Sequence, residues 1–85
     1  MEINLGQVVF SKAGRDSGRK FIIIDIINEA YVLVSDGDLR KTEKPKKKRI
    51  KHIEITKEVA EQIGEKLKSE QRVTNSEIRK ALAVL

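Results

Sequence analysis

The side chains of this chain that could do chemistry are mostly cations, and they gather in one short segment. Residues 38–56 hold eight Lys or Arg against three Asp or Glu, a net charge of +5 that equals the net charge of the whole chain. Residues 1–37 carry −1 and residues 57–85 carry +1. A basic excess confined to one stretch is the electrostatic footprint of a protein that binds a polyanion.

A second basic group flanks a turn that contains Gly14 and Gly18. Neutralising phosphates with Lys and Arg releases counterions, which supplies much of the affinity for RNA, and glycine lets the backbone approach a phosphate or base closely. The candidate RNA-binding residues are therefore Lys12, Gly14, Arg15, Gly18, Arg19, Lys20, Arg40, Lys41, Lys44, Lys46, Lys47, Lys48, Arg49, Lys51 and His52.

Other chemistries lack the residues that they need. The chain has no cysteine and a single histidine, His52, which excludes disulfides, cysteine-ligated metals and a histidine metal cluster. Gly14 and Gly18 are not followed by the Gly-Lys-Ser/Thr ending of a nucleotide-binding loop. No nucleophile, base and orienting group form an evident set. We expect no enzyme, no catalytic residue, no metal and no cofactor.

The basic run also has plainer interpretations. It could be a solvated loop that keeps a small protein soluble, and its charge alone would serve DNA or an acidic membrane surface equally well. We favour RNA because every position from Lys44 to Arg49 is basic or proline, in a chain that is otherwise balanced in charge. Phe10, Phe21 and Tyr31 could stack on bases, but their strand spacing favours core or half-buried positions.

Short strands are expected to position the cations. Alternating apolar residues predict strands that open at Val8, run over Lys20–Ile27, and run over Ala30–Ser35. Ile22, Ile24 and Ile26 share the face that we assign to the interior, and Phe21, Ile23 and Ile27 share the outer face. We further predict a weak strand over Leu39–Glu43, a solvated basic loop over Lys44–Lys48, and a strand over Ile50–Ile55 with a bulge or twist.

After these strands, the spacing of apolar residues changes from the period of strands to that of helices. Thr56 is predicted to cap a helix with Val59, Ile63 and Leu67 on one stripe, and Thr74–Glu77 forms a capping box for a second helix. Its stripe holds Ile78, Leu82 and Leu85. We expect both helices to cover the outer face of the strands at Phe21, Ile23 and Ile27. The alternative is that the stripes form a protein-binding or dimerising surface.

The stretch Leu5–Gly37 resembles the KOW segment of the archaeal and eukaryotic large-subunit ribosomal protein fourteen-e family. The similar features are Gly6, Ala13-Gly14-Arg15, Gly18-Arg19-Lys20, the Ile-rich strand with Asp25, and Tyr31-Val32-Leu33-Val34. The later stretch KKKRIKHIEIT is similar to the basic strand of that family. Ser17 and Phe21 stand where the wider KOW motif has lysine and glycine, so the likeness is to the ribosomal subfamily.

The fold that follows is mainly β: a small SH3-like KOW barrel of about five strands over residues 1–56, with a C-terminal helical hairpin over 57–85 packed on it. The resemblance implies an RNA-binding ribosomal or ribosome-associated protein, part of a ribonucleoprotein in translation, that contacts structured RNA through basic loops. Its expected partners are ribosomal RNA above all and ribosomal proteins.

The remaining expectations concern place and partners. No signal pattern or membrane-spanning run is evident, so we expect a cytoplasmic monomer without membrane contact. The alternative function is a protein-interaction module of the transcription or translation machinery, which would bind through the apolar helix residues.

Overall fold

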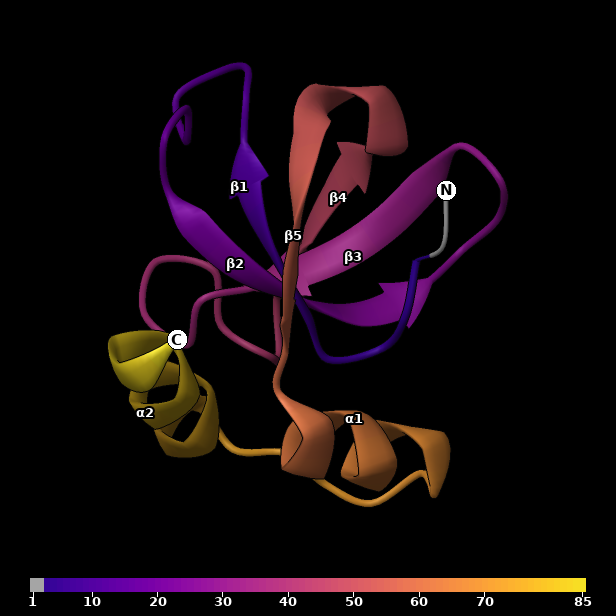
Figure 1. Ribbon diagram of the computed structural model, residues 1–85, viewed down its shortest axis with the longest axis vertical. Helices are drawn as coiled ribbons and strands as arrows, with labels where there is room; N and C mark the ends of the chain where they lie inside the picture. The colour runs from indigo at the N-terminus through magenta and orange to yellow at the C-terminus, as the bar shows by residue number, and fades with distance from the viewer. Residues whose placement is uncertain (1–2) are drawn as a thin grey trace.

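The computed structural model describes residues 3–85 as one five-stranded sheet followed by two helices (Figure 1). The strand order is β4-β3-β2-β1-β5, and every neighbouring pair is antiparallel. This confirms the predicted mainly β class and fits an SH3-like barrel. The elements are β1 Gln7–Ser11, β2 Lys20–Ile26, β3 Tyr31–Ser35, β4 Lys46–Arg49, a 3-10 turn Ile50–His52, β5 Ile53–Val59, α1 Glu61–Lys68 and α2 Asn75–Val84.

Two apolar clusters lie on opposite faces of the central strands. The inner cluster fills the curled sheet and consists of Val9, Phe21, Ile23, Val32, Val34 and Ile53. The outer cluster lies between the sheet and the helices and consists of Val8, Ile22, Ala60, Ile63, Val73 and Ile78. Successive side chains of a strand point to opposite faces, so β1 and β2 each supply both clusters.

The predicted inner face of β2 is wrong. Phe21 and Ile23 lie in the inner cluster, whereas Ile22 and Ile24 pack with the helices and Ile26 is 40% exposed. The helices therefore cover Ile22 instead of the expected Phe21 and Ile23. The alternation of residues assigns them to the two faces of a strand. Where both faces are apolar, it does not show which face points into the barrel.

The predicted strand over Leu39–Glu43 and the basic loop over Lys44–Lys48 are also wrong. Residues 36–45 form an irregular segment, because side chains take the backbone N–H groups that a ladder would need. The carboxylate of Asp36 accepts from the N–H groups of Asp38 and Arg40. The strand lies later, where Lys46 and Lys48 pair with Val34 and Val32 of β3.

The expected strand over Ile50–Ile55 begins instead at Ile53, after the 3-10 turn that breaks the alternation. The predicted Thr56 cap is wrong because β5 continues past residue 56 to Val59. The Thr56 hydroxyl donates to the carbonyl of Val8 at 2.7 Å, inside the sheet. Helix α1 starts from Ala60, which has no polar side chain to cap it.

The capping box at the start of α2 is confirmed. The Thr74 hydroxyl accepts from the backbone N–H of Glu77, whose carboxylate accepts from the backbone N–H of Thr74. Ile78 is fully buried, and Leu67 and Leu82 pack against the outer cluster. Within residues 3–85, neither helix has the length and apolar character needed to cross a bilayer.

The chain entering β1 crosses α1 at two glycines. Gly6 accepts from the N–H of Ala60 at 2.8 Å and donates to the carbonyl of Ile23 at 2.8 Å. A Cβ on Gly64 would lie 2.7 Å from the carbonyl oxygen of Leu5. The helix can therefore approach the sheet this closely because position 64 has no side chain.

Gly64→Ala tests this close approach. Alanine at an ordinary helix position would stabilise by about 1 kcal/mol, whereas forcing atoms into a packed contact costs about 1–3 kcal/mol. We expect the contact to dominate, so that the urea midpoint of unfolding falls. The control is Gln62→Ala on the exposed side of α1, which should leave the midpoint unchanged or raise it. An equal rise in both variants would contradict the contact.

Candidate nucleic-acid interface

Two basic turns lie side by side at the end of the barrel that faces away from the helices (Figure 1). One is the β1–β2 turn, residues 12–19, and the other is the 3-10 turn Ile50–His52 that joins β4 to β5. The N–H of Lys12 donates to the carbonyl of His52 at 2.8 Å. The structure thus joins two groups of candidate residues that are far apart in the sequence. We call these two turns together the turn edge.

The turn edge presents several exposed cations. Lys12, Arg15 and Lys51 are exposed, and His52 is half-buried. Gly14 and Gly18 have positive φ angles of 78° and 84°, which is the left-handed backbone that the tight turn requires. Next to the turn, Lys20 is half-buried and holds its Nζ atom 5.9 Å from the ring centroid of Phe10.

Lys48 differs from the other candidate lysines because it is only 8% exposed. Its Nζ atom donates to the carbonyl of Ala13 at 3.0 Å. This hydrogen bond ties β4 to the β1–β2 turn from within. Lys48 therefore acts on the turn edge by holding its backbone, whereas its neighbours Lys47 and Arg49 are exposed and Lys46 is half-buried.

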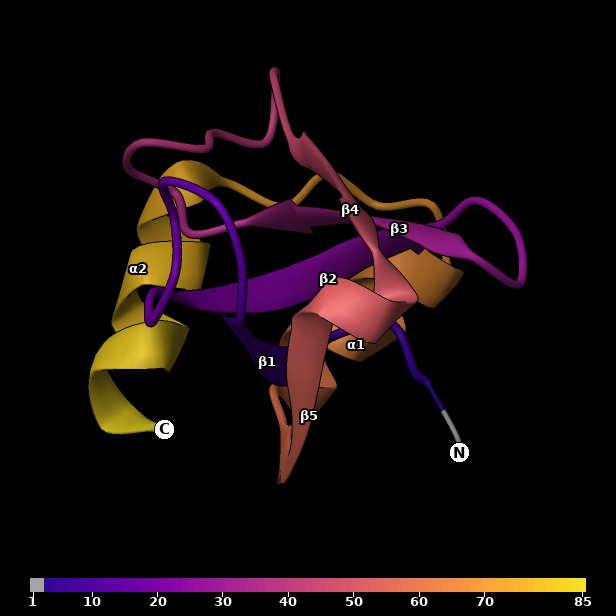
Figure 2. The same cartoon turned by 90° about the horizontal axis from the view of Figure 1, so that it is seen from above.

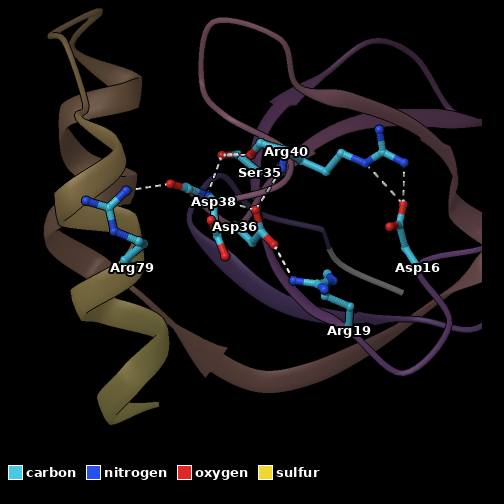
Figure 3. Close-up of polar contacts among 8 residues, drawn as sticks. Asp16, Arg19, Ser35, Asp36, Asp38, Arg40 and Arg79 are labelled. Carbon is cyan, nitrogen blue, oxygen red and sulfur yellow. Dashed lines mark hydrogen bonds and ion pairs between the residues drawn. The ribbon is translucent and has the colours of Figure 1, made fainter.

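Arg19 and Arg40 are engaged in ion pairs that link the β1–β2 turn to residues 36–45 (Figure 3). Arg19 Nη1 lies 3.0 Å from Asp36 Oδ2, and Arg40 donates through Nε at 3.2 Å and Nη2 at 3.0 Å to Asp16 Oδ2. Each segment contributes one arginine and one aspartate. Both carboxylates are buried, so the pairs fix the two segments relative to each other.

Asp36 organises the backbone around it (Figure 3). Its Oδ1 atom accepts from the N–H groups of Asp38 and Arg40, both at 2.9 Å. Burial raises the pKa of Asp36, but these two N–H groups and the guanidinium of Arg19 lower it by more, so the pKa lies below its ordinary value of 3.8. The side chain is a structural anion that stays charged at neutral pH.

Lys41 and Lys44 lie on the irregular segment that docks against α2. The N–H of Thr42 donates to Asn75 Oδ1 at 2.8 Å, and Arg79 Nη1 donates to the carbonyl of Gly37 at 2.6 Å. In the view from above, this segment runs past the first turn of α2 (Figure 2). Both lysines are exposed, but they belong to this neighbouring segment and not to the turn edge.

The strand spacing of Tyr31 predicts a core or half-buried position, so Tyr31 is not among the candidate RNA-binding residues. Tyr31 is half-buried, and Lys47 Nζ and Arg49 Cζ lie 4.5 Å and 5.4 Å from its ring centroid. Its strand partner is Arg49. The signal that would have found this cluster is the register of β3 with β4, and the predicted basic loop concealed that pairing.

Comparisons with known proteins find archaeal ribosomal proteins. The chain is 43% identical over 54 residues to large ribosomal subunit protein eL14 of Desulfurococcus amylolyticus, covering 64% of this chain and 56% of that protein. It is 30% identical over 80 residues to the eL14 proteins of Pyrobaculum calidifontis and Aeropyrum pernix, covering 94% of this chain and 71% and 73% of theirs. The alignment to the first relative thus spans about half of its length. No family profile matches the chain.

Asp36→Asn tests the anion that fixes residues 36–45. We expect a loss of about 1–3 kcal/mol in the free energy of unfolding at pH 7, because Asn cannot accept all the donors around Asp36. The ion-pair part is small, since the Arg19 side chain is 40% exposed. The measurement is urea unfolding, and the control is Asp38→Asn, whose side chain is exposed.

The loss of stability in Asp36→Asn should depend on pH. The pKa of Asp36 is lower in the folded chain than in the unfolded chain. The charged carboxylate therefore contributes its full stabilisation of the fold above about pH 4, and this contribution is lost as the pH falls through the folded-state pKa. The stability gap between the native chain and Asp36→Asn should therefore narrow at about pH 2. A gap of constant size at both pH values would mean that the charge of Asp36 does not matter.

Proposed function

The chain belongs to the family of large ribosomal subunit protein eL14, and from that premise we propose that it is an RNA-binding module of the ribosome. Its partner is ribosomal RNA, with neighbouring ribosomal proteins as further contacts, and it acts in the cytoplasm as a single copy. Its work is binding, not catalysis. The relatives carry the ribosomal assignment, and the turn edge is the surface that we assign to the RNA.

The observation that carries this proposal is the hydrogen bond between Lys12 and His52. It joins two basic turns into one surface, on which Lys12, Arg15 and Lys51 are exposed. Exposed cations that do not contact buried groups of the protein can neutralise phosphates. Phosphate contacts of this kind suit folded RNA, which is recognised largely through its shape and backbone.

The other basic residues of the candidate set have a supporting role in this proposal. Lys48 holds the β1–β2 turn through the carbonyl of Ala13, and Arg19 and Arg40 hold it through the carboxylates of Asp36 and Asp16. A loop that is fixed before binding loses less conformational entropy when RNA arrives. Gly14 and Gly18 allow the backbone itself to come close to the RNA.

In this proposal the strands, the last of which ends at Val59, are the part that meets RNA, and the helices that follow support them. The outer cluster joins Val8 and Ile22 of the sheet to Ile63 and Ile78 of the helices, so the two parts share a core. Leu67 and Leu82, through which a protein-interaction module would bind, pack against this cluster. That packing favours the RNA proposal over the alternative.

A triple variant tests the turn edge: Lys12→Gln, Arg15→Gln and Lys51→Gln. Lys48 is left intact because its loss would break a buried contact. We expect affinity for ribosomal RNA to fall by at least about tenfold, and the slope of log K against log salt to flatten by about 2 to 3, since each phosphate contact contributes about 0.7–0.9. The measurement is fluorescence anisotropy with labelled ribosomal RNA fragments.

The matched control removes the same number of charges from the helical side: Lys68→Gln, Arg72→Gln and Lys80→Gln, all exposed. It should retain nearly all of the affinity, apart from the small effect of a lower net charge. Equal losses in the two triple variants would show that the chain binds through its overall charge, and the turn edge would lose its special role.

A further inference from the structure

Tyr31 lies at the start of β3 with two cations of β4 against its ring. Arg49 is its partner in the β3–β4 register, with Cζ 5.4 Å from the ring centroid, and Lys47 Nζ lies 4.5 Å from the same point. Both distances fall within the range of cation–π attraction. Lys47 and Arg49 are exposed, so each can leave the ring without breaking a buried contact.

This cluster lies on the face of β3 that points away from the barrel interior. Val32 and Val34 are fully buried in the inner cluster, so the alternating residues Tyr31 and Leu33 face outward. The helices cover the same face further along the sheet, where Val8 and Ile22 lie. Tyr31 and Leu33 remain half-buried beyond the helices. Tyr31 therefore keeps part of its surface exposed on this outer face, next to Lys47 and Arg49.

We propose that Tyr31, Lys47 and Arg49 form a binding site for an unpaired nucleotide of the RNA, with its base stacked on the Tyr31 ring and its phosphates held by the two cations. This inference rests on the proposed function and adds to it a contact beyond phosphate neutralisation. A nucleotide is the ligand that this cluster fits, because it combines a flat π-face with a negative charge one sugar away. Base stacking on aromatic rings is indifferent to sequence.

The other aromatic residues of the described chain are less suited to this role. Phe21 is fully buried in the inner cluster. Phe10 is half-buried, and the cation over its ring, Lys20 Nζ, is 5.9 Å from the centroid. The Lys47 ammonium is closer to Tyr31, and the Arg49 guanidinium adds a planar group that can itself stack on a base. The cations and the ring thus come together at Tyr31.

The chain supplies its own probe, because it has one tyrosine and no tryptophan. Its intrinsic fluorescence therefore reports on Tyr31 alone. The probes are an RNA hairpin with an unpaired adenosine loop and a fully paired RNA duplex with the same number of nucleotides. Anisotropy of labelled RNA measures binding, and tyrosine emission measures stacking. We expect both RNAs to bind, and the hairpin to quench the emission much more than the duplex.

Variants at Tyr31 supply a second readout. The stacked base should make the chain bind the hairpin more tightly than the duplex. Tyr31→Leu should reduce this preference by about 5- to 100-fold, which is the range of one lost base–aromatic stack. Tyr31→Phe keeps the ring and should preserve the preference. Phe10→Leu is the matched control and should also preserve it. Circular dichroism establishes that each variant is folded.

The outcomes separate this site from the proposed function. If both RNAs bind while the tyrosine emission stays unchanged, the nucleotide site is wrong and the RNA-binding module stands. The same holds if folded Tyr31→Leu keeps the full hairpin preference. If neither RNA binds, the proposed function and the nucleotide site are both overturned.

Discussion

Neighbouring residues of β1 and β2 are buried on opposite faces of the sheet, with Val8 and Ile22 under the helices and Val9 and Ile23 inside the barrel. Burying one such side chain is worth about 1.5–3 kcal/mol, so neither face of these strands can be left to water. The helices must therefore lie against the sheet, and the close contact between Gly64 and Leu5 shows how tightly. The basic turns extend from the opposite end of the barrel, away from α1 and α2 (Figure 1).

The cations fall into two groups according to the protein groups that they contact. Lys48, Arg19 and Arg40 contact groups of the protein itself: a carbonyl in the first case and buried carboxylates in the other two. A charge near the interior needs such a partner, because removing it from water is costly. In the described structure, the side chains of Lys12, Arg15 and Lys51 make no such contact with the protein and are exposed. In our account the first group shapes the surface and the second meets the RNA.

Much of the fold could be predicted from the sequence, because local signals agree with it. Alternation gives the first three strands, and Thr74 with Glu77 gives the start of α2. The errors arose where side-chain hydrogen bonds and pairing with a distant strand decide. Asp36 takes the N–H groups of Asp38 and Arg40, and Asn75 takes that of Thr42. Pairing with β3 turns the lysine run into β4. Lysines repeated at every position show no alternation, so nothing local marks that strand.

The candidate site was predicted as a set of residues but not as a geometry. Charge segregation identified the basic segment, yet it could not distinguish the buried Lys48 from the exposed Lys47. It also could not show that Asp16 and Asp36 neutralise two of the arginines. Tyr31 was missed because its cations come from a neighbouring strand. The RNA-binding role of the turn edge itself stays a prediction.

That role is tested most directly by ultraviolet crosslinking of the chain to ribosomal RNA, with mass spectrometry of the crosslinked peptides. We expect nucleotides to be attached to peptides from residues 12–20 and 46–52, which form the turn edge and its flanking strands. Crosslinks confined to the helices, residues 61–84, would contradict this role, because the RNA would then lie at the opposite end of the molecule (Figure 1).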